Sequence, residues 1–572
     1  MAEDAAAAGL TGALRTLLAA LPARRRRQLW LLNLLTLANA AADMAMVAAA
    51  MLFLAAVAGQ ALPAALAGWL PDVGPDQRIA QAALAFALAA LGANLVRLLH
   101  LRLSEAYAAA VAHELTVEVQ RRVLAQPYAF HARHRSSELL ASLETAGALA
   151  FNLIRPLLQT FAAVATSAAI LALLASLAPL PALAAVVILA VLYLAVARLA
   201  ARRLAANSDE AAQAFGERIR KVQEGLGAIR DLKIDHLERA QLEDFRLADA
   251  RYMRASASTA FIAAAPRYVI EVGAVLLVAA IALVMARRGD SDSLVLLGGI
   301  AVGGLRLLPL LQSAYRSWAY MTASRAIIGQ VTAMLRLPVH DEEDQAEPLP
   351  FRQAMRLDRV SFSYEGRRQP ALRDISLDIR SGERIAIAGA TGSGKSTLAD
   401  VLMGLLLPDE GTIAVDGHRL SAGNVRAWQR NIAHVSQSVF LLDDSIARNI
   451  AFSQAGEPVD LARVRRAAEA AGIADFIDSL PDGFATSAGE RGIRLSGGQR
   501  QRIAIARALY KRASVLVLDE ATNALDEETE ARVLANIFAD PDLTILVIAH
   551  RPSALANCDR TIHLGEGRII TG

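Results

Sequence analysis

LSGGQ at residues 495–499 stands between two other distinctive stretches, GATGSGKST at 389–397 and VLVLDE at 515–520. The Gly-rich stretch offers consecutive backbone N–H groups to phosphates, and it ends in Lys395, a point charge, and Ser396, whose hydroxyl can bind Mg²⁺. By itself this stretch predicts only a site for a nucleoside triphosphate.

The LSGGQ segment predicts a second anion-binding turn. The Ser496 hydroxyl and the N–H groups of Gly497 and Gly498 would open the following helix, QRIAIARALYK, and present its positive end to a phosphate. A single domain does not need two such anion-binding sites for one γ-phosphate. The segments therefore predict an ATP site that only a pair of these domains completes.

Together the three segments resemble the ATP-binding cassette (ABC) family, in which the LSGGQ of one subunit closes over the nucleotide held by the other. The resemblance implies that the nucleotide held by the partner subunit is contacted by Leu495, Ser496, Gly497, Gly498 and Gln499. It implies that the chain's own nucleotide is bound by Tyr364, Gly389, Ala390, Thr391, Gly392, Ser393, Gly394, Lys395, Ser396, Thr397 and Gln437. Tyr364 would stack on adenine; a strand aromatic in the core is the alternative.

The apolar run 515–518 predicts a buried strand whose carboxyl end delivers Asp519 and Glu520 to the crevice where α/β sheets bind ligands. Asp519 would hold Mg²⁺ through its water shell, and Glu520 would polarise the attacking water. A helix N-terminal acid, stabilised by the helix dipole, is the alternative for Glu520.

Two further residues complete the catalytic set that the resemblance implies. Gln437, in HVSQSVF, matches the family's Q-loop, whose amide reaches Mg²⁺ and the attacking water; a solvated loop glutamine is the alternative. His550, after TILVIAH, matches the switch histidine that contacts the γ-phosphate, and would otherwise be an ordinary strand-end histidine. Residues 523–526 read NALD where SALD is commoner, a departure that concerns communication between the two sites. The expected Mg²⁺ ligands are Ser396, Gln437 and Asp519.

The composition indicates that part of the chain spans a membrane. The 572 residues exceed one ordinary domain, and 55% of them are hydrophobic, a value between soluble and fully membrane-embedded proteins. The formal net charge of +3 is small for this length, so nucleic acid is not an expected partner. The single cysteine, Cys558, excludes an intramolecular disulfide and fits a reducing compartment.

Six apolar segments are long enough to cross a hydrocarbon core, which needs roughly 20 helical residues. They lie at about 28–59, 78–103, 146–177, 180–204, 259–286 and 294–320. Basic residues at the ends that would be cytoplasmic, beginning with Arg24 to Arg27, set the orientation. A secretory signal is the alternative for the first segment, but its apolar run continues well past about 15 residues. The expected architecture is a six-helix transmembrane domain at 1–335, a linker at 336–352 and an α/β P-loop ATPase domain at 353–572.

Two long connections, about 104–145 and 205–258, are expected to extend the spans as helices on the cytoplasmic side. In ABC exporters the tips of such extensions are coupling helices that dock on the ATPase domain. The candidates here are 127–134 and 225–235.

Ionisable residues inside the spans bear on the substrate, because each costs on the order of 2.5 to 3.5 kcal/mol to insert and usually faces a cavity. They are Asp43, Arg97, Arg155, Arg267, Glu271 and Arg306. Four arginines against two acids leave a surplus of +2 per subunit, which suits an anionic group. The alternatives are that Arg97 snorkels and that Arg267 and Glu271 neutralise each other on one helix face.

Two membrane segments and the Gly-rich stretch resemble the PglK-type flippases of lipid-linked oligosaccharides. The segments are APRYVIEVGAV at 265–275 and LRLLPLLQSAYRSW at 305–318, and the stretch is GATGSGKST. In that family cavity arginines are thought to engage the pyrophosphate. Its short amphipathic helix on the outer face has a candidate counterpart at 61–71, for which a plain loop is the alternative.

The resemblances imply a homodimeric ABC exporter half-transporter in a bacterial inner membrane, using ATP and Mg²⁺ to flip a polyprenyl-pyrophosphate-linked oligosaccharide. Intact motifs in one chain favour two identical copies over a heterodimer. The first alternative is an exporter of drugs, peptides or other lipids, because the same ATPase serves many cargoes. The second is a non-transporting ABC regulator, which would lack integral membrane segments.

Overall fold

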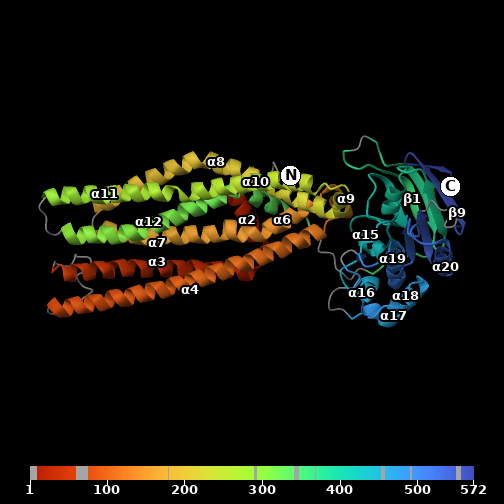
Figure 1. Ribbon diagram of the computed structural model, residues 1–572, viewed down its shortest axis with the longest axis horizontal. Helices are drawn as coiled ribbons and strands as arrows, with labels where there is room; N and C mark the ends of the chain where they lie inside the picture. Colours follow the sequence, from red (N-terminus) through yellow and green to blue (C-terminus); the bar gives the residue numbers. More distant parts are fainter. Residues whose placement is uncertain are drawn as a thin grey trace. The chain divides into compact units, whose positions relative to one another are not determined.

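The computed structural model describes residues 10–59, 75–177, 179–288, 293–339, 347–366, 369–452, 458–489, 492–548 and 556–571. The chain forms a helical unit, Met1–Gln126 with Phe130–His340, and an α/β unit, Asp341–Gly572 with Pro127–Ala129 (Figure 1). The candidate interfacial segment at 61–71 and His550 lie outside the described residues.

The helical unit is built from long helices joined by short ones (Figure 1). Their bounds are α2 Leu10–Ala20, α3 Ala23–Val57, α4 Pro75–Leu124, α5 Tyr128–Arg133, α6 Ser136–Leu149, the π-helix η2 Ala150–Ile154, α7 Arg155–Leu177, α8 Pro179–Gly227, α9 Ile229–Ile234, α10 Glu238–Ala264, α11 Pro266–Arg288, α12 Ser293–Ala323 and α13 Arg325–Leu335.

Several of these helices are much longer than a membrane is thick. The 50 residues of α4 rise about 75 Å at 1.5 Å per residue, against about 30 Å for a hydrocarbon core. Both α4 and the 49-residue α8 therefore run past the expected spans. Within the described residues, three helical stretches are long and apolar enough to cross a membrane, namely Ala23–Val57, Asp76–Leu124 and Ser136–Ser176.

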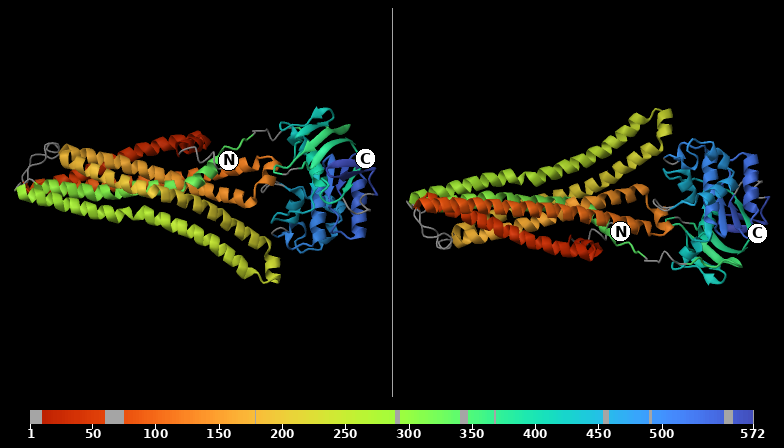
Figure 2. Two further views of the ribbon diagram at one scale, coloured as in Figure 1. Left: turned by 90° about the horizontal axis from the view of Figure 1, so that it is seen from above. Right: turned by 90° about the horizontal axis from the view of Figure 1, so that it is seen from below.

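The long helices pack in pairs: α3 lies along α4, α8 along α10, and α7 along α12 (Figure 1). The pair α8 and α10 diverges from the other helices toward the short α9 that joins it (Figure 2). The N-terminal α2 inserts Leu17 into a cluster with Leu115 of α4 and Leu335 of α13, all nearly inaccessible. Among the described residues, this cluster therefore joins α2, the helix nearest the N-terminus, to α13, the last helix of the unit.

The α/β unit contains two sheets flanked by helices, as an α/β ATPase domain requires. Its strands are β1 Ala354–Phe362, β2 Leu372–Arg380, β3 Arg384–Gly389, β4 Glu410–Val415, β5 His418–Arg419, β6 Ile432–Val435, β7 Val515–Asp519, β8 Thr544–Ile548, β9 Arg560–Gly565 and β10 Arg568–Thr571. Its helices are α14 Lys395–Leu402, α15 Val425–Gln429, α16 Ile446–Ala451, α17 Leu461–Ala470, α18 Ala474–Asp478, the 3₁₀ helix η3 Gly483–Ala485, α19 Gly497–Lys511 and α20 Glu527–Phe538.

Strand order explains how distant motifs meet. The antiparallel sheet has the order β2-β1-β4-β5, and the larger sheet has the order β10-β9-β3-β8-β7-β6, in which every neighbour pair except β10 with β9 is parallel. Because β3, β8 and β7 are adjacent and parallel, their carboxyl ends lie at one edge. The Gly-rich loop follows β3, and Asp519 ends β7, paired with Ile548 of β8.

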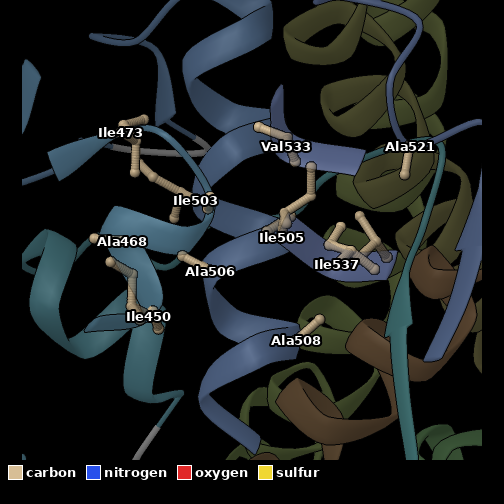
Figure 3. Packing of buried hydrophobic residues seen from close by; sticks show 14 of the residues in the cluster. Ile450, Ala468, Ile473, Ile503, Ile505, Ala506, Ala508, Ala521, Val533 and Ile537 are labelled. Atoms are coloured by element: carbon tan, nitrogen blue, oxygen red, sulfur yellow. The ribbon is translucent and has the colours of Figure 1, made fainter. Parts of the chain in front are cut away.

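Helix α19 runs through the middle of one hydrophobic core (Figure 3). Its Ile503 lies toward Ile473, whereas Ile505 lies toward Val533 and Ile537 of α20 (Figure 3). These side chains are almost fully buried. Burying two sides of α19 fixes the helix whose first turn is the LSGGQ segment.

Candidate functional site

The Gly-rich loop forms a tight cradle between β3 and α14. Lys395 is buried, and its Nζ donates hydrogen bonds to the carbonyl oxygens of Gly389 (2.8 Å) and Ala390 (3.0 Å). Gly394 caps α14 with φ +105°, and a Cβ there would come within 2.8 Å of the Ala371 oxygen. The close backbone approach therefore requires glycine, and the first turn of α14 is left open to phosphate.

Tyr364 lies beside this cradle, as expected for a residue that meets the nucleotide's base. Its hydroxyl is 3.3 Å from the Thr397 hydroxyl of α14. Its ring packs edge-on against Phe362, with 5.1 Å between the ring centroids. The edge contact holds the ring at the rim of the core, so the stacking role and the core alternative are both compatible with its position.

Glu520 is held at the end of β7 by contacts from three segments. Its N–H donates to the Ile548 oxygen (2.8 Å), and its Oε2 accepts hydrogen bonds from the Gln437 amide (2.8 Å) and the Asn523 amide (2.9 Å). Its φ of +49° is in the left-handed region, which costs a non-glycine residue of order 1–2 kcal/mol. Strain of this kind is typical of functional sites.

The pKa values at this edge fit a cation site. Burial raises the pKa of Asp519, and the charge of Glu520 raises it further, while Lys395 opposes the shift. Burial together with the charge of Asp519 raises the pKa of Asp400 to about 6. A divalent cation would stabilise these crowded carboxylates, with Ser396, Gln437 and Asp519 as its protein ligands. In the part of the chain that the structure describes, no three His, Cys, Asp or Glu side chains converge on a metal position.

We expect Asp400→Asn to stabilise the ATPase domain at pH 8 more than at pH 5. A carboxyl group whose pKa rises on folding from 3.8 to about 6 ionises more easily in the unfolded chain, so it costs stability as the pH rises from about 4, and the full cost is reached only above about pH 6. After allowance for solvent screening, the cost is about 1 to 2 kcal/mol, or roughly 2–8 °C in melting temperature. Differential scanning fluorimetry with EDTA and without nucleotide measures it.

The matched control for this change is Glu410→Gln, which neutralises an exposed carboxylate of the same domain. It should change the melting temperature by less than about 1 °C at either pH. An equal gain for Asp400→Asn at both pH values would contradict the buried-charge explanation.

The LSGGQ turn is a complete capping box. Ser496 accepts a hydrogen bond from the Gln499 N–H (3.2 Å), and the Gln499 side chain accepts one from the Ser496 N–H (2.8 Å). A Cβ on Gly498 would come within 2.9 Å of the Ala524 oxygen, and Gln501 accepts from the Ala524 N–H (2.9 Å). The signature turn and the NALD segment are therefore packed together as one piece.

Asn523, the residue in which NALD departs from SALD, has a contact that sequence reasoning missed. Its amide donates to Glu520, and the same segment is bonded to the signature helix through Ala524. The signal that could have found it is the spacing, because residues three apart across a strand-to-helix turn reach each other. Asn523 thus supplies a hydrogen bond to the candidate catalytic carboxylate.

The helical unit contains a polar cavity of about 480 Å³ between α3, α4, α7 and α12. Its polar lining consists of Asn39, Asp43, Arg97, His100, Ser104, Glu105, Arg155, Gln159, Thr166, Arg306 and Ser313. Three of the candidate substrate residues, Arg97, Arg155 and Arg306, are therefore brought together from three helices. Arg267 and Glu271 are not among the lining residues.

Most of the cavity's arginines have acidic partners. Arg97 contacts Asp43, and Arg155 Nε lies 2.8 Å from Glu105 Oε1. Arg306 donates to the Met46 sulfur at 3.3 Å, and within the described residues it has no carboxylate at salt-bridge distance. Arg267 and Glu271 pair with each other (3.7 Å), both more than half exposed, which is the self-pairing alternative.

Glu105 changes the charge balance expected from the sequence. Three arginines against Asp43 and Glu105 leave the cavity with +1 per chain instead of the expected +2. Glu105 was missed because it follows the expected span 78–103 by two residues. Its spacing of eight residues from Arg97 places both on one face of α4, which is the signal that could have found it.

Two prolines shape the helices that carry the cavity arginines. Pro156 follows Arg155 and lacks an N–H, and the preceding turn is the π-helix η2, with Arg155 N–H bonded to the Ala150 oxygen. Pro309 lies inside α12, three residues after Arg306. Both arginines therefore lie where the helical hydrogen-bond pattern is interrupted, which is common at functional positions.

Comparison with known proteins matches both units separately. Residues 372–523 match the family described as "ABC transporter", and residues 44–297 match "ABC transporter transmembrane region". A solved structure, of a bacterial Atm1-family ABC exporter with ATP bound, superposes with TM-score 0.80 at 26% identity and covers 96% of this chain and 94% of that one.

Curated relatives are similar over shorter stretches. The "ATP-dependent lipid A-core flippase" of Alkalilimnicola ehrlichii is 37% identical over 368 residues, 62% of this chain and 61% of that protein. The protein of the same name from Pseudomonas aeruginosa is 41% identical over 292 residues, 50% of this chain and 48% of that protein. The chain thus spans about three fifths of the first relative's length and about half of the second's.

A transmembrane region and a P-loop ATPase domain joined in one polypeptide define the class of this protein. The chain has the ABC exporter fold, a transmembrane region joined to an ABC ATPase domain, which confirms the expected fold class.

Proposed function

We propose that two copies of this chain form an ATP-driven exporter that flips an anionic, sugar-bearing lipid across a bacterial inner membrane. ATP and Mg²⁺ are bound at the edge formed by β3, β7 and β8. Lys395 and the Gly-rich cradle hold the phosphates, Asp519 holds Mg²⁺ through water, and Glu520 orients the attacking water with Gln437. The membrane units supply the cavity and the ATPase domains supply the driving force.

The homodimer is supported by the completeness of the motifs. One chain carries the phosphate cradle, the acidic pair and an intact signature turn, so two identical chains supply both halves of two ATP sites. A heterodimer would be expected where one partner has a degenerate motif. Basic residues at the inner ends of the helices support an ATPase domain in the cytoplasm.

The observation that carries the substrate class is Arg306 in the cavity. A guanidinium group has five N–H donors. The Arg306 guanidinium contacts the thioether sulfur of Met46, which is a weak acceptor. Phosphate oxygens would accept directional, charge-assisted bonds from it. A phosphate or pyrophosphate group is therefore the ligand that fits this position.

The relatives' names and the membrane segments agree on a phosphorylated glycolipid but differ on its kind. The 368-residue match is longer than the ATPase region 353–572, so it includes part of the membrane unit, and the matched protein is named for lipid A-core. The segments around Arg267 and Arg306 resemble those of PglK-type flippases instead. Phosphate and sugar on a lipid are common to both substrates, and the experiment separates them.

Arg306→Ala should abolish flipping of the phosphorylated lipid while basal ATP hydrolysis persists, because the change lies far along the chain from the ATP site. Arg306→Lys should impair flipping at least about tenfold, since a point charge cannot reproduce bidentate contacts to phosphate. Flipping is measured in proteoliposomes with lipid A-core in one arm and a polyprenyl-pyrophosphate glycan in the other.

The matched control is Arg316→Ala, an exposed arginine of the same helix that does not line the cavity. It should leave flipping unchanged at an unchanged melting temperature. If Arg306→Ala transports normally and only uncharged amphiphiles stimulate ATP hydrolysis, the proposal is wrong. The exporter of drugs, peptides or other lipids then replaces it.

A further inference from the structure

The most deeply buried charge of the cavity belongs to an acid, although the proposed ligand is an anion. The Asp43 side chain is 4% exposed, and its Oδ1 contacts Arg97 Nη2 of the neighbouring helix. Its Oδ2 lies 3.4 Å from the Asn39 amide nitrogen one turn earlier on α3. The carboxylate is therefore bonded on both oxygens and enclosed.

Arg97, which pairs with Asp43, is much more exposed than Asp43. The Arg97 side chain is 39% exposed, and it also reaches the Asn94 side chain at 3.3 Å, so only part of its N–H fork is taken up by protein. Arg306 lines the same cavity from α12. A ligand phosphate entering between the two guanidinium groups would lie beside the Asp43 carboxylate.

We infer that Asp43 is a built-in counter-anion that competes with the substrate's anionic group for the cavity arginines. The inference rests on the proposed function, since it concerns the same cavity. Asp43 holds Arg97 in the absence of ligand and repels a second anion on that guanidinium. It thereby lowers the affinity for any single negative group, so that a weakly charged lipid is held poorly.

The physical argument is a balance between two anions for one cation. A guanidinium group can bind two carboxylate or phosphate groups, but like charges placed close together in a medium of low dielectric constant repel strongly. Removing the charge of Asp43 while keeping its shape should therefore favour the ligand. Asparagine does this, and Arg97 remains accessible to the cavity, so its charge is not stranded in the core.

The test compares the wild type with Asp43→Asn in lipid nanodiscs of neutral phosphatidylcholine, using lipid A and the same glycolipid after enzymatic removal of its phosphates. The readout is the glycolipid concentration that gives half of the maximal ATPase stimulation. Asp43→Asn should lower this concentration about tenfold for lipid A, which corresponds to about 1.4 kcal/mol, and leave it unchanged for the dephosphorylated form.

Two further variants separate ligand competition from a purely structural ion pair. Asp76→Asn removes an exposed carboxylate near the start of α4, outside the cavity, and should behave as the wild type. The double variant Asp43→Asn with Arg97→Gln removes the whole ion pair. It should lose the gain in apparent affinity, because the cation for which the two anions compete is gone. If this double variant keeps the full gain of the single variant, competition for Arg97 is wrong.

The outcomes also distinguish this inference from the proposed function. If lipid A stimulates the wild type and Arg306→Ala abolishes the stimulation, but Asp43→Asn has no effect or helps both glycolipids equally, the counter-anion is wrong and the proposed function stands. If lipid A and a polyprenyl-pyrophosphate glycan both fail to stimulate the wild type, the proposed function is wrong and the inference fails with it.

Discussion

Glu520→Gln should retain ATP binding and lose hydrolysis by about 100-fold or more, which is the effect of removing a general base from a positioned water. The change keeps the size of the side chain, and an amide oxygen can still accept from Gln437 and Asn523, which both bond to Glu520 Oε2. The steady-state ATPase rate and nucleotide binding, each in the full-length chain, are the measurements.

The backbone at Glu520 supplies the control for this prediction. Glutamine and glutamate bear the same cost of the φ of +49°, so the substitution should change the melting temperature by less than about 2 °C. Glu520→Gly relieves that strain while removing the carboxylate, and it should be inactive but no less stable. Near-normal turnover in either variant would assign the base to another residue.

The local geometry of the candidate ATP site was predictable because its motifs are local. A phosphate cradle depends on the backbone of nine consecutive residues, 389–397, and a capping box on four, so their order in the sequence already specifies the geometry. The alternation of buried strands and helices then places the carboxyl ends of parallel strands together. The sequence does not specify side-chain contacts across that edge, such as the one between Gln437 and Glu520.

The membrane cavity was less predictable because its contacts join different helices. Apolar runs locate helices but carry no information on which helices are neighbours or which faces meet. The pairs Asp43 with Arg97 and Arg155 with Glu105 each join residues about 50 positions apart. Arg267 and Glu271, four residues apart on one helix, could be paired from the sequence alone, and the structure pairs them.

A second large effect is expected from Ser496→Arg, which should reduce hydrolysis by about 100-fold or more while leaving nucleotide binding through Tyr364 and Lys395 intact. The substitution puts a bulky side chain on the turn that is proposed to close over the partner's γ-phosphate. Loss of the helix cap alone costs about 1 kcal/mol. Ser496→Ala therefore serves as the control, because it removes the cap and the hydroxyl without adding bulk.

Mixed dimers decide whether the signature turn acts on its own chain or on the partner. In a dimer with Glu520→Gln on one chain and Ser496→Arg on the other, a site shared between chains collects both defects, so the second site stays intact and roughly half of the activity remains if the sites are independent. With both changes on one chain and a wild-type partner, each shared site has one defect and hydrolysis is lost. Sites confined to single chains predict the reverse, because the first dimer then has two defective chains and the second has one intact chain. Differently tagged chains, co-expressed and purified by both tags, give these two dimers, and their ATPase rates separate the arrangements.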